Sequence, residues 1–430
     1  GHGVSYILTI QSQAALDACG RDYQVILTAP DPAELALATE RRAGAYVRLR
    51  HDADTLYDDG RQLLIRRAAI ERFIEEGCSV KAFADAPMQF AQPALAARRA
   101  PAAAVNPTIV SNAFIAAMMN TVTSAAVYNL TAQLSGETPI TIGTNTYTLL
   151  SRHTRYGNPF QKDTEFVAAT LSNWGLAPEY FYWTNGWYTN RNVIATLPGG
   201  SRPDEMIFMT AHIDDTSQLI SRAPGADDNA SGCVALLNAA ELMRNHNFER
   251  TVRFVFFTGE EQGLLGSAVY AAALTAQPYT VAAVYNFDMI AWDAINGPIM
   301  NLHIRQPSHP QYADDMAVAT LFTNVVAAYG MAASLEPVII ANGDSASDHA
   351  SFWQRGYPAV LAIEQYPGDF NAYYHTTNDR VQNVNLAYYT AFVKAAVGSV
   401  AHAAIIVPEP ALIALMLGAP LLALRRRLRQ

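Results

Sequence analysis

Histidine and acidic residues recur at the ends of apolar segments, and their side chains suit the binding of zinc-like metal ions. They are His212-Ile213-Asp214 after one apolar segment, Asp228 in the loop "PGADDNASG", Glu260 and Glu261 after "FVFFTG", Asp288 after "VYNF", and His375 in "YYHTTND". Taken singly, each is more often a satisfied polar group or part of a solvated face. Imidazole and carboxylate are zinc ligands, whereas calcium and magnesium sites seldom include two histidines. Their recurrence in one part of the chain favours a metal site.

The spacing of these residues adds two expectations. Alternate residues of a strand face the same side, so Asp214 is expected to accept a hydrogen bond from the ring nitrogen of His212 that does not bind metal. Glu260 and Glu261 point in different directions if the strand ends there, which suits one general base and one ligand.

The segments that must position these residues read as buried strands alternating with helices. The apolar runs rich in β-branched and aromatic residues lie at 206–213, 251–259, 280–289, 300–304 and 357–363, and the helical patterns at 232–246, 263–274 and 311–330. Such runs suit strands covered on both faces. They predict an α/β three-layer sandwich with a central mixed, largely parallel β-sheet flanked by helices. In such sheets functional residues gather at the carboxyl ends of the strands.

Composition changes divide the chain into four parts. Residues 1–90 are predicted to form a small α/β domain, with strands at "YQVILTA" and "CSVKAF" and a helix over 66–77. This domain is either a prodomain that covers the active site or an accessory binding domain. Residues 91–107, rich in Ala and Pro, read as a linker. Residues 108–405 form the large domain, and residues 406–430 form a tail.

Bulk composition excludes several classes of protein. Half of the 430 residues are hydrophobic and 16% are charged, which indicates a folded protein rather than a disordered one. A net charge of −9 makes nucleic acid an unsuitable partner. Cys19, Cys78 and Cys233 lack the close pairs of a thiolate zinc site, and a Cys19–Cys78 disulfide stays open.

Six motifs carry a family resemblance. "AHIDD", "PGADDNASG", "TGEEQGLLGS", "NFDM", "SDHASFWQRGYPA" and "YYHTTND" follow one another in the order found in secreted bacterial aminopeptidases with a co-catalytic zinc pair. The chain resembles the catalytic domain of that metallopeptidase family from about Thr108 to Ile405. The resemblance implies a peptidase with two zinc ions per chain, in which a shared water attacks the scissile carbonyl.

Matched position by position, the resemblance also implies roles for single residues. Asp228 would bridge both metals, and the bond between Asp228 and Asn229 would be cis. The remaining ligands would be His212 and Asp288 at one metal, and Glu261 and His375 at the other. Glu260 would act as general base and acid. Asp227 is interpreted as a solvated turn residue.

Neighbouring residues receive weaker assignments. The resemblance implies that Tyr374 helps to hold the tetrahedral intermediate, although the residue also reads as one ring of an aromatic run. Met289 falls where relatives line an apolar side-chain pocket. Asp348, like Asp214, is expected to support the ligands without binding metal. Asp344 is interpreted as part of a surface turn, with selection of a basic side chain or binding of the substrate amine as the alternative.

The tail "VPEPALIALMLGAPLLALRRRLRQ" is similar to a PEP-CTERM sorting signal of Gram-negative bacteria. Its apolar stretch is shorter than an ordinary spanning helix, and its arginines follow the positive-inside rule. The similarity implies export to the periplasm, cell surface or medium, transient membrane association, and cleavage by a sorting protease.

The sequence as a whole predicts an exported zinc-dependent aminopeptidase that acts on the N-termini of peptides or proteins. A carboxypeptidase or a single-zinc glutaminyl cyclase on the same scaffold is the alternative. A non-catalytic receptor-like domain is the alternative of another class, in which loss of ligands or base would be expected.

Overall fold

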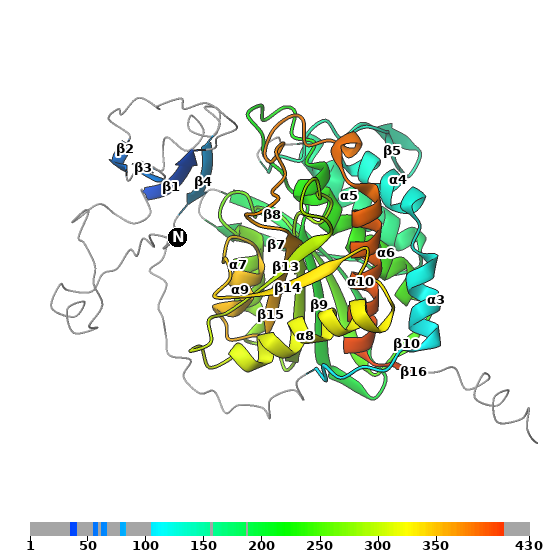
Figure 1. Cartoon of the computed structure of the whole chain (residues 1–430). Helices are drawn as coiled ribbons and strands as arrows, with labels where there is room; N and C mark the ends of the chain where they lie inside the picture. The colour runs from blue at the N-terminus through cyan, green and yellow to red at the C-terminus, as the bar shows by residue number, and fades with distance from the viewer. Residues whose placement is uncertain are drawn as a thin grey trace, which may run out of the picture.

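The computed structural model describes residues 105–154, 158–185 and 188–407, together with four short strands before them (Figure 1). These strands are β1 (Leu35–Glu40), β2 (Thr55–Asp58), β3 (Gln62–Arg66) and β4 (Cys78–Ala82), which form an antiparallel sheet in the order β2-β3-β1-β4. Strand β4 coincides with the strand predicted at "CSVKAF". The helix predicted over 66–77 begins on the last residue of β3, and the rest of it lies outside the described residues. The same is true of the strand predicted at 23–29, of Cys19, and of residues 91–104 and 408–430.

An eight-stranded mixed sheet forms the centre of the large domain. Its strands are β7 (Glu179–Asn185), β8 (Tyr188–Leu197), β9 (Arg202–His212), β11 (Arg250–Phe257), β12 (Thr280–Phe287), β13 (Ile299–Ile304), β14 (Glu336–Ala341) and β15 (Ala359–Glu364). They lie in the order β14-β13-β15-β12-β9-β11-β8-β7. The four strands from β15 to β11 are parallel, and β8 and β7 add an antiparallel hairpin at one edge. The predicted fold class is confirmed.

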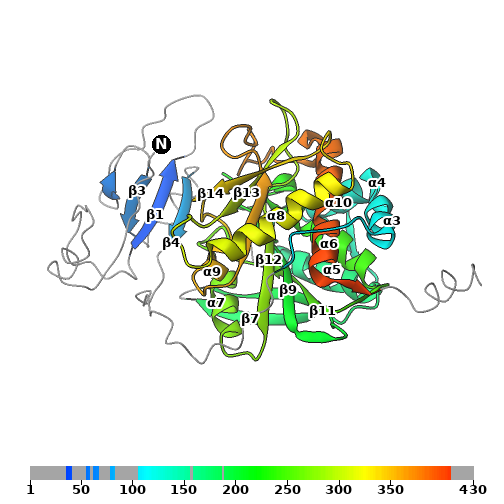
Figure 2. The ribbon, with the colours of Figure 1, turned by 60° about the horizontal axis from the view of Figure 1, so that its bottom comes forward.

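Helices cover both faces of this sheet, as Figures 1 and 2 show. One face carries α6 (Gly232–Met243), α8 (Tyr312–Ala328) and α10 (Leu386–Ala404), with α3 (Ala113–Thr121), α4 (Ser124–Leu134) and α5 (Asn158–Asn173) around them. The other carries α7 (Leu265–Leu274) and α9 (His349–Trp353). Alternation within β9 fits this: Ile207 and Met209 join the larger core cluster, whereas Met206 and Phe208 join the smaller one.

The strand order reverses at β9. Strand β11 follows β9 along the chain on one side of it, and β12 then returns to its other side. Open α/β sheets bind their ligands outside the carboxyl ends of the strands at such a reversal. The residues that follow β9, β11 and β12 therefore meet at one edge of the sheet.

Short pairings complete the domain. Strand β10 (Asn247–Phe248) pairs with β16 (Ile406–Val407), so the domain extends two residues beyond the predicted boundary at Ile405. Val105, inside the predicted linker, is buried in the core. Strands β5 (Ile140–Ile142) and β6 (Asn145–Tyr147) form a separate hairpin.

No single helix among the described residues is long and apolar enough to cross a membrane. Only α3 and α4 together would have the length and composition, across a 53° bend. Both contribute buried residues to the core.

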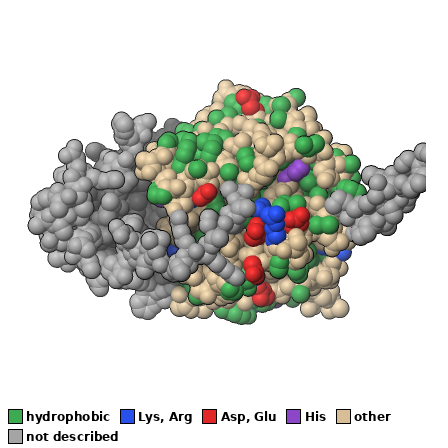
Figure 3. All heavy atoms as spheres, turned by 90° about the horizontal axis from the view of Figure 1, so that it is seen from below, with side chains coloured by type: hydrophobic (Ala, Val, Ile, Leu, Met, Phe, Trp, Pro, Cys, Tyr) green, Lys and Arg blue, Asp and Glu red, His purple; other side chains and the backbone are tan. Residues whose placement is uncertain are grey.

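Basic side chains on the face seen from below lie beside acidic ones (Figure 3). Ion pairs between described residues include Arg202 with Glu249 at 3.2 Å and Arg250 with Glu205 at 2.7 Å.

A buried ion pair fastens α8 to the sheet. Arg305, just after β13, donates from Nε and Nη2 to Asp315 of α8 at 2.6 and 2.7 Å, and Ala359 N–H donates to the same carboxylate at 3.0 Å. We expect Asp315→Ala to lower the free energy of unfolding by about 3–5 kcal/mol, because it leaves a buried guanidinium unpaired. Chemical denaturation measures this. The exposed neighbour Asp314→Ala is the control, and equal effects of the two substitutions would contradict the assignment.

Candidate metal centre

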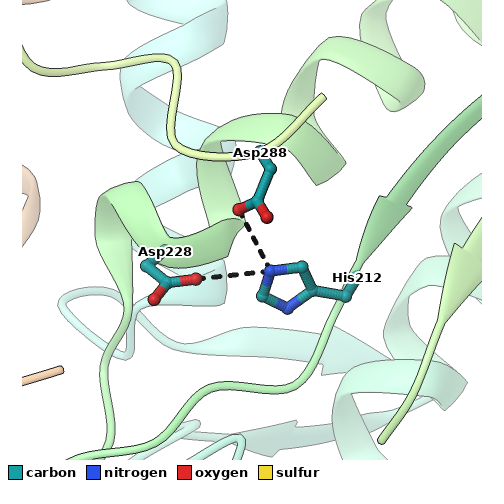
Figure 4. Close-up of side chains that lie close together, drawn as sticks. All are labelled: His212, Asp228 and Asp288. Atoms are coloured by element: carbon teal, nitrogen blue, oxygen red, sulfur yellow. Dashed lines mark hydrogen bonds and ion pairs between the residues drawn. The ribbon is translucent and has the colours of Figure 1, made fainter. Parts of the chain in front are cut away.

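The first group of candidate ligands surrounds the imidazole of His212, the last residue of β9. Figure 4 shows Asp228 and Asp288 pointing at the same ring nitrogen. His212 Nε2 lies 3.3 Å from Asp228 Oδ1 and 3.1 Å from Asp288 Oδ1. Strand β9, the loop before α6 and the end of β12 each supply one of these side chains.

The second group surrounds the imidazole of His375. Its Nε2 lies 2.8 Å from Asp228 Oδ2 and 2.8 Å from Glu261 Oε1. Asp228 thus presents one oxygen to each group. In each group the three ligand atoms lie within 4.8 Å of one another, close enough to surround one ion. The structure therefore brings together all five residues predicted as ligands.

The loop that carries Asp228 has an irregular backbone and packs closely against the end of β12. It forms the irregular helical turn η3 (Ala226–Ser231), and the peptide bond from Asp228 to Asn229 is cis, as the resemblance implied. Gly225 has φ +48°, and a Cβ atom there would lie 2.2 Å from the Asp228 carbonyl oxygen. Asn229 donates to the Phe287 carbonyl at 2.9 Å and accepts from Gly232 N–H at 2.8 Å, which ties the loop to the end of β12.

Burial of this negative cluster makes it a candidate cation site. Burial, together with the charges of Asp228 and Glu260, raises the pKa of Glu261 well above its usual range. Burial opposes protonation of His212, but the charges of Asp288 and Glu260 prevail and raise its pKa well above its usual range. Divalent cations would offset this repulsion, and they bind the deprotonated forms of these groups. The donor set of imidazole and carboxylate fits zinc.

Glu260, the predicted base, lies beside both groups. It is buried, and its charge acts on both His212 and Glu261. Asp214 fixes its backbone: Oδ1 accepts from Glu260 N–H at 3.2 Å and Oδ2 accepts from Glu261 N–H at 3.3 Å. Thr154 donates to the same carboxylate at 2.8 Å.

The predicted bond between the Asp214 carboxylate and His212 is wrong. His212 Nδ1 lies 2.9 Å from the backbone carbonyl oxygen of Asp214, whereas the nearer carboxylate oxygen is 3.8 Å away. Strand β9 ends at His212, so strand alternation does not extend to Asp214. Asp214 still supports the site, through the backbone of Glu260 and Glu261.

We expect Asp214→Asn to lower kcat by roughly 10–100-fold, the usual loss when a group that orients a metal ligand is changed. A single amide oxygen cannot accept on both sides as the carboxylate does. Steady-state kinetics with Asp204→Asn, an exposed site on the same strand, as control provide the measurement. Wild-type kcat in Asp214→Asn would contradict the role.

An apolar cluster adjoins the second group. The Tyr374 ring stacks on that of His375, with centroids 3.7 Å apart, and lies edge-on to Phe370 at 4.8 Å. Both aromatic side chains pack against Met289, Leu361 and Ile363. Met289 itself is buried in this cluster beside the centre. The catalytic role of Tyr374 stays a prediction.

Asp344 and Asp348 lie in the segment that connects β14 to α9. Asp348 is fully buried just before α9, and burial raises its pKa to about 7 against the opposing charge of His212. Its predicted supporting role stays a prediction. Asp344 holds two histidines through its backbone: its N–H donates to His303 Nδ1 at 2.8 Å, and its carbonyl oxygen lies 2.9 Å from His349 Nε2.

The interpretation of Asp227 as a solvated residue is wrong. Asp227 is 1% exposed, and its two oxygens accept from Ala291 N–H at 2.8 Å and from Asn371 Nδ2 at 2.9 Å. Burial raises its pKa to about 6, although a hydrogen bond with Glu364 opposes the shift. Asp379, four residues after His375, accepts the N–H groups of Asp227 and Asp228.

Sequence reasoning also missed the role of Arg152, a fully buried arginine. Its guanidinium donates to the carbonyl oxygens of Ile213, Leu134, Pro224 and Gly225. It therefore holds the segment before η3 against the end of β9. Its isolated position in "LLSRHTRYG" gives no signal of this role.

Comparisons with known proteins identify the large domain. Residues 192–400 match the profile of Peptidase family M28, and this segment contains the five candidate ligands and Glu260. Probable leucine aminopeptidases of Trichophyton verrucosum and Arthroderma otae are 31% and 32% identical over 224 and 216 residues. The alignments cover 49% and 48% of this chain but 56% and 55% of those proteins, so the chain spans little more than half their length. The large domain is therefore similar to Peptidase family M28 over residues 192–400.

Solved structures share the fold. The LapA aminopeptidase of Legionella pneumophila has a TM-score of 0.61 at 18% identity, covering 86% of this chain and 98% of that one. Macrostomum lignano glutaminyl cyclase has a TM-score of 0.56 at 19% identity, covering 72% of this chain and 97% of its own. The same architecture thus occurs in an aminopeptidase and in a cyclase.

Proposed function

We propose that this chain, which matches Peptidase family M28 over residues 192–400, is an aminopeptidase that removes N-terminal residues from peptides with two zinc ions per chain. Asp228 carries the proposal, because its Oδ1 and Oδ2 face two separate groups of ligands at 3.3 and 2.8 Å from the two histidines. The names of the probable leucine aminopeptidases support the choice of substrate. A single-metal cyclase would need only one of the two groups.

His212, Asp228 and Asp288 would hold one zinc ion, and Asp228, Glu261 and His375 the other. When bound, the pair would activate a water molecule and polarise the scissile carbonyl. Glu260 would take a proton from the attacking water and return it to the leaving amine. Asp214 accepts hydrogen bonds from the N–H groups of Glu260 and Glu261, and so fixes the backbone positions of the base and the ligand relative to each other.

The side chain of the substrate's first residue would lie against Phe370 and Tyr374, the partly exposed rings that pack on buried Met289, Leu361 and Ile363. This cluster is apolar and adjoins His375. Apolar N-terminal residues such as leucine are therefore the proposed substrates, because their burial there removes apolar area from water.

A panel of substrates tests the proposal. Leucyl p-nitroanilide should be hydrolysed and its N-acetylated form should not. An N-blocked dipeptide with a free carboxylate reports carboxypeptidase activity, and release of ammonia from glutaminyl peptides reports cyclisation. A dizinc aminopeptidase loses activity on chelation and regains it with zinc. Activity on only the N-blocked dipeptide or the glutaminyl peptides would contradict the proposal.

Export is a separate proposal that rests on the sequence of residues 407–430. The Pro-Glu-Pro motif, apolar stretch and terminal arginines would sort the protein to the cell envelope, with transient membrane association and cleavage by a sorting protease. Fractionation of cells that express the full chain, with Pro408-Glu409-Pro410 replaced by alanines as the comparison, tests this. Equal distribution of both proteins would contradict it.

A further inference from the structure

The loop that carries His375 needs a device that holds it in place. It runs from the end of β15 to Asp379, and His375 itself has a left-handed backbone, with φ +55°. This conformation is unfavourable for a residue with a side chain. Surrounding contacts must therefore fix the loop if Nε2 is to face Asp228 and Glu261.

Asn371, four residues before His375, forms hydrogen bonds within its own loop, with the end of β15 and with the loop that carries Asp228. Within the loop, its side-chain oxygen accepts from Tyr373 N–H at 2.8 Å and its carbonyl oxygen accepts from Tyr374 N–H at 3.1 Å. Its own N–H donates to Glu364 Oε1 at 2.8 Å, at the end of β15. The residue is 4% exposed. It thus folds the segment that leads into His375.

The amide of Asn371 reaches the loop that carries the bridging aspartate. Nδ2 donates to Asp227 Oδ2 at 2.9 Å and to Asp379 Oδ1 at 3.3 Å. Asp227 precedes Asp228, and Asp379 accepts the N–H group of Asp228 at 2.9 Å. One amide therefore links the two loops whose side chains meet in the second group of ligands.

Only a donor fits at this position. Nδ2 faces two carboxylates, and a third carboxylate at position 371 would repel both. Shorter side chains lack a donor at the position of Nδ2. The amide of asparagine supplies the donor and also the acceptor for Tyr373 N–H.

We propose that Asn371 is the positioning residue of the Glu261/His375 metal site, setting His375 against Asp228 without contacting metal or substrate. The inference rests on the proposed dizinc function. It gives Asp227 its role: that carboxylate is the anchor for the amide, between the bridging ligand and the loop of His375.

Stepwise zinc affinities of the metal-free full-length protein test this, measured by competition with a chromophoric chelator. In Asn371→Ala we expect one zinc ion to bind as in the wild type and the other to bind roughly 10–100-fold more weakly. Excess zinc should restore most of kcat with KM unchanged, since no substrate contact is lost. Asn112→Ala, which removes the cap of α3 far from the site, controls for general destabilisation.

Asn371→Ser is the second variant should alanine prevent folding, because serine can still accept from Tyr373 N–H while lacking the distant donor. Two zinc ions bound with wild-type affinity in a folded Asn371 variant would overturn the inference and leave the proposed function standing. Equal weakening of both ions would also overturn it. A wild-type protein that binds fewer than two zinc ions would contradict the proposed function, and the inference with it.

Discussion

Glu260→Gln is expected to abolish turnover while both zinc ions remain bound. Glutamine preserves the shape of the side chain but cannot take a proton from water. General acid–base groups contribute about 10²–10⁴-fold to rate, so kcat on leucyl p-nitroanilide should fall by that factor. Because Glu260 is not among the five candidate ligands, zinc content should stay unchanged.

The control for this variant is Glu336→Gln, an exposed glutamate at the start of β14. Kinetics and metal analysis are performed on the same preparations of the three proteins. A Glu260→Gln protein with wild-type kcat would show that another group is the base. Loss of one zinc ion from this variant would instead make Glu260 a ligand.

Asp228→Asn is expected to lose both metal sites together, with activity at background. An amide offers one neutral oxygen, so it cannot replace Oδ1 and Oδ2 at the two groups. Asp288→Asn, the comparison, should weaken only the His212 site. Zinc affinity of the two variants, measured side by side, therefore separates the shared ligand from an unshared one.

The same substitution should stabilise the metal-free protein. The charge of Asp228 raises the pKa of Glu261, Asp215 and Asp379, in each case as a contribution additional to burial. Removing that charge relieves repulsion among these carboxylates, so the melting temperature of the metal-free variant should rise. Zinc should then add little, whereas it should strongly stabilise the wild type. Wild-type stabilisation by zinc in Asp228→Asn would contradict the bridging role.

That several candidate ligands lie close together could be predicted from the sequence for a physical reason. Buried parallel strands are marked by apolar runs, and their carboxyl ends must lie along one edge of the sheet. His212 and Asp288, at the ends of β9 and β12, could be placed in this way. His375 could not, because no strand precedes it directly, and the family resemblance supplied it.

Other features depend on contacts that local sequence does not encode. Asp227 looks solvated beside Asp228, yet it is buried by Asn371, which lies 144 residues further along the chain. The edge strand β7 and its neighbour β8 mix polar and aromatic residues, and β8 is only partly buried. Their pattern therefore lacks the continuous apolar run that marked β9, β11 and β12.

The count of zinc ions needed for catalysis tests the central claim most directly. Metal-free protein is titrated with zinc while hydrolysis of leucyl p-nitroanilide and bound metal are followed together. The bridging geometry of Asp228 predicts that full activity requires two zinc ions per chain, with one removed in Glu261→Ala. Full activity with a single bound zinc ion, or activity that persists without metal, would contradict the account.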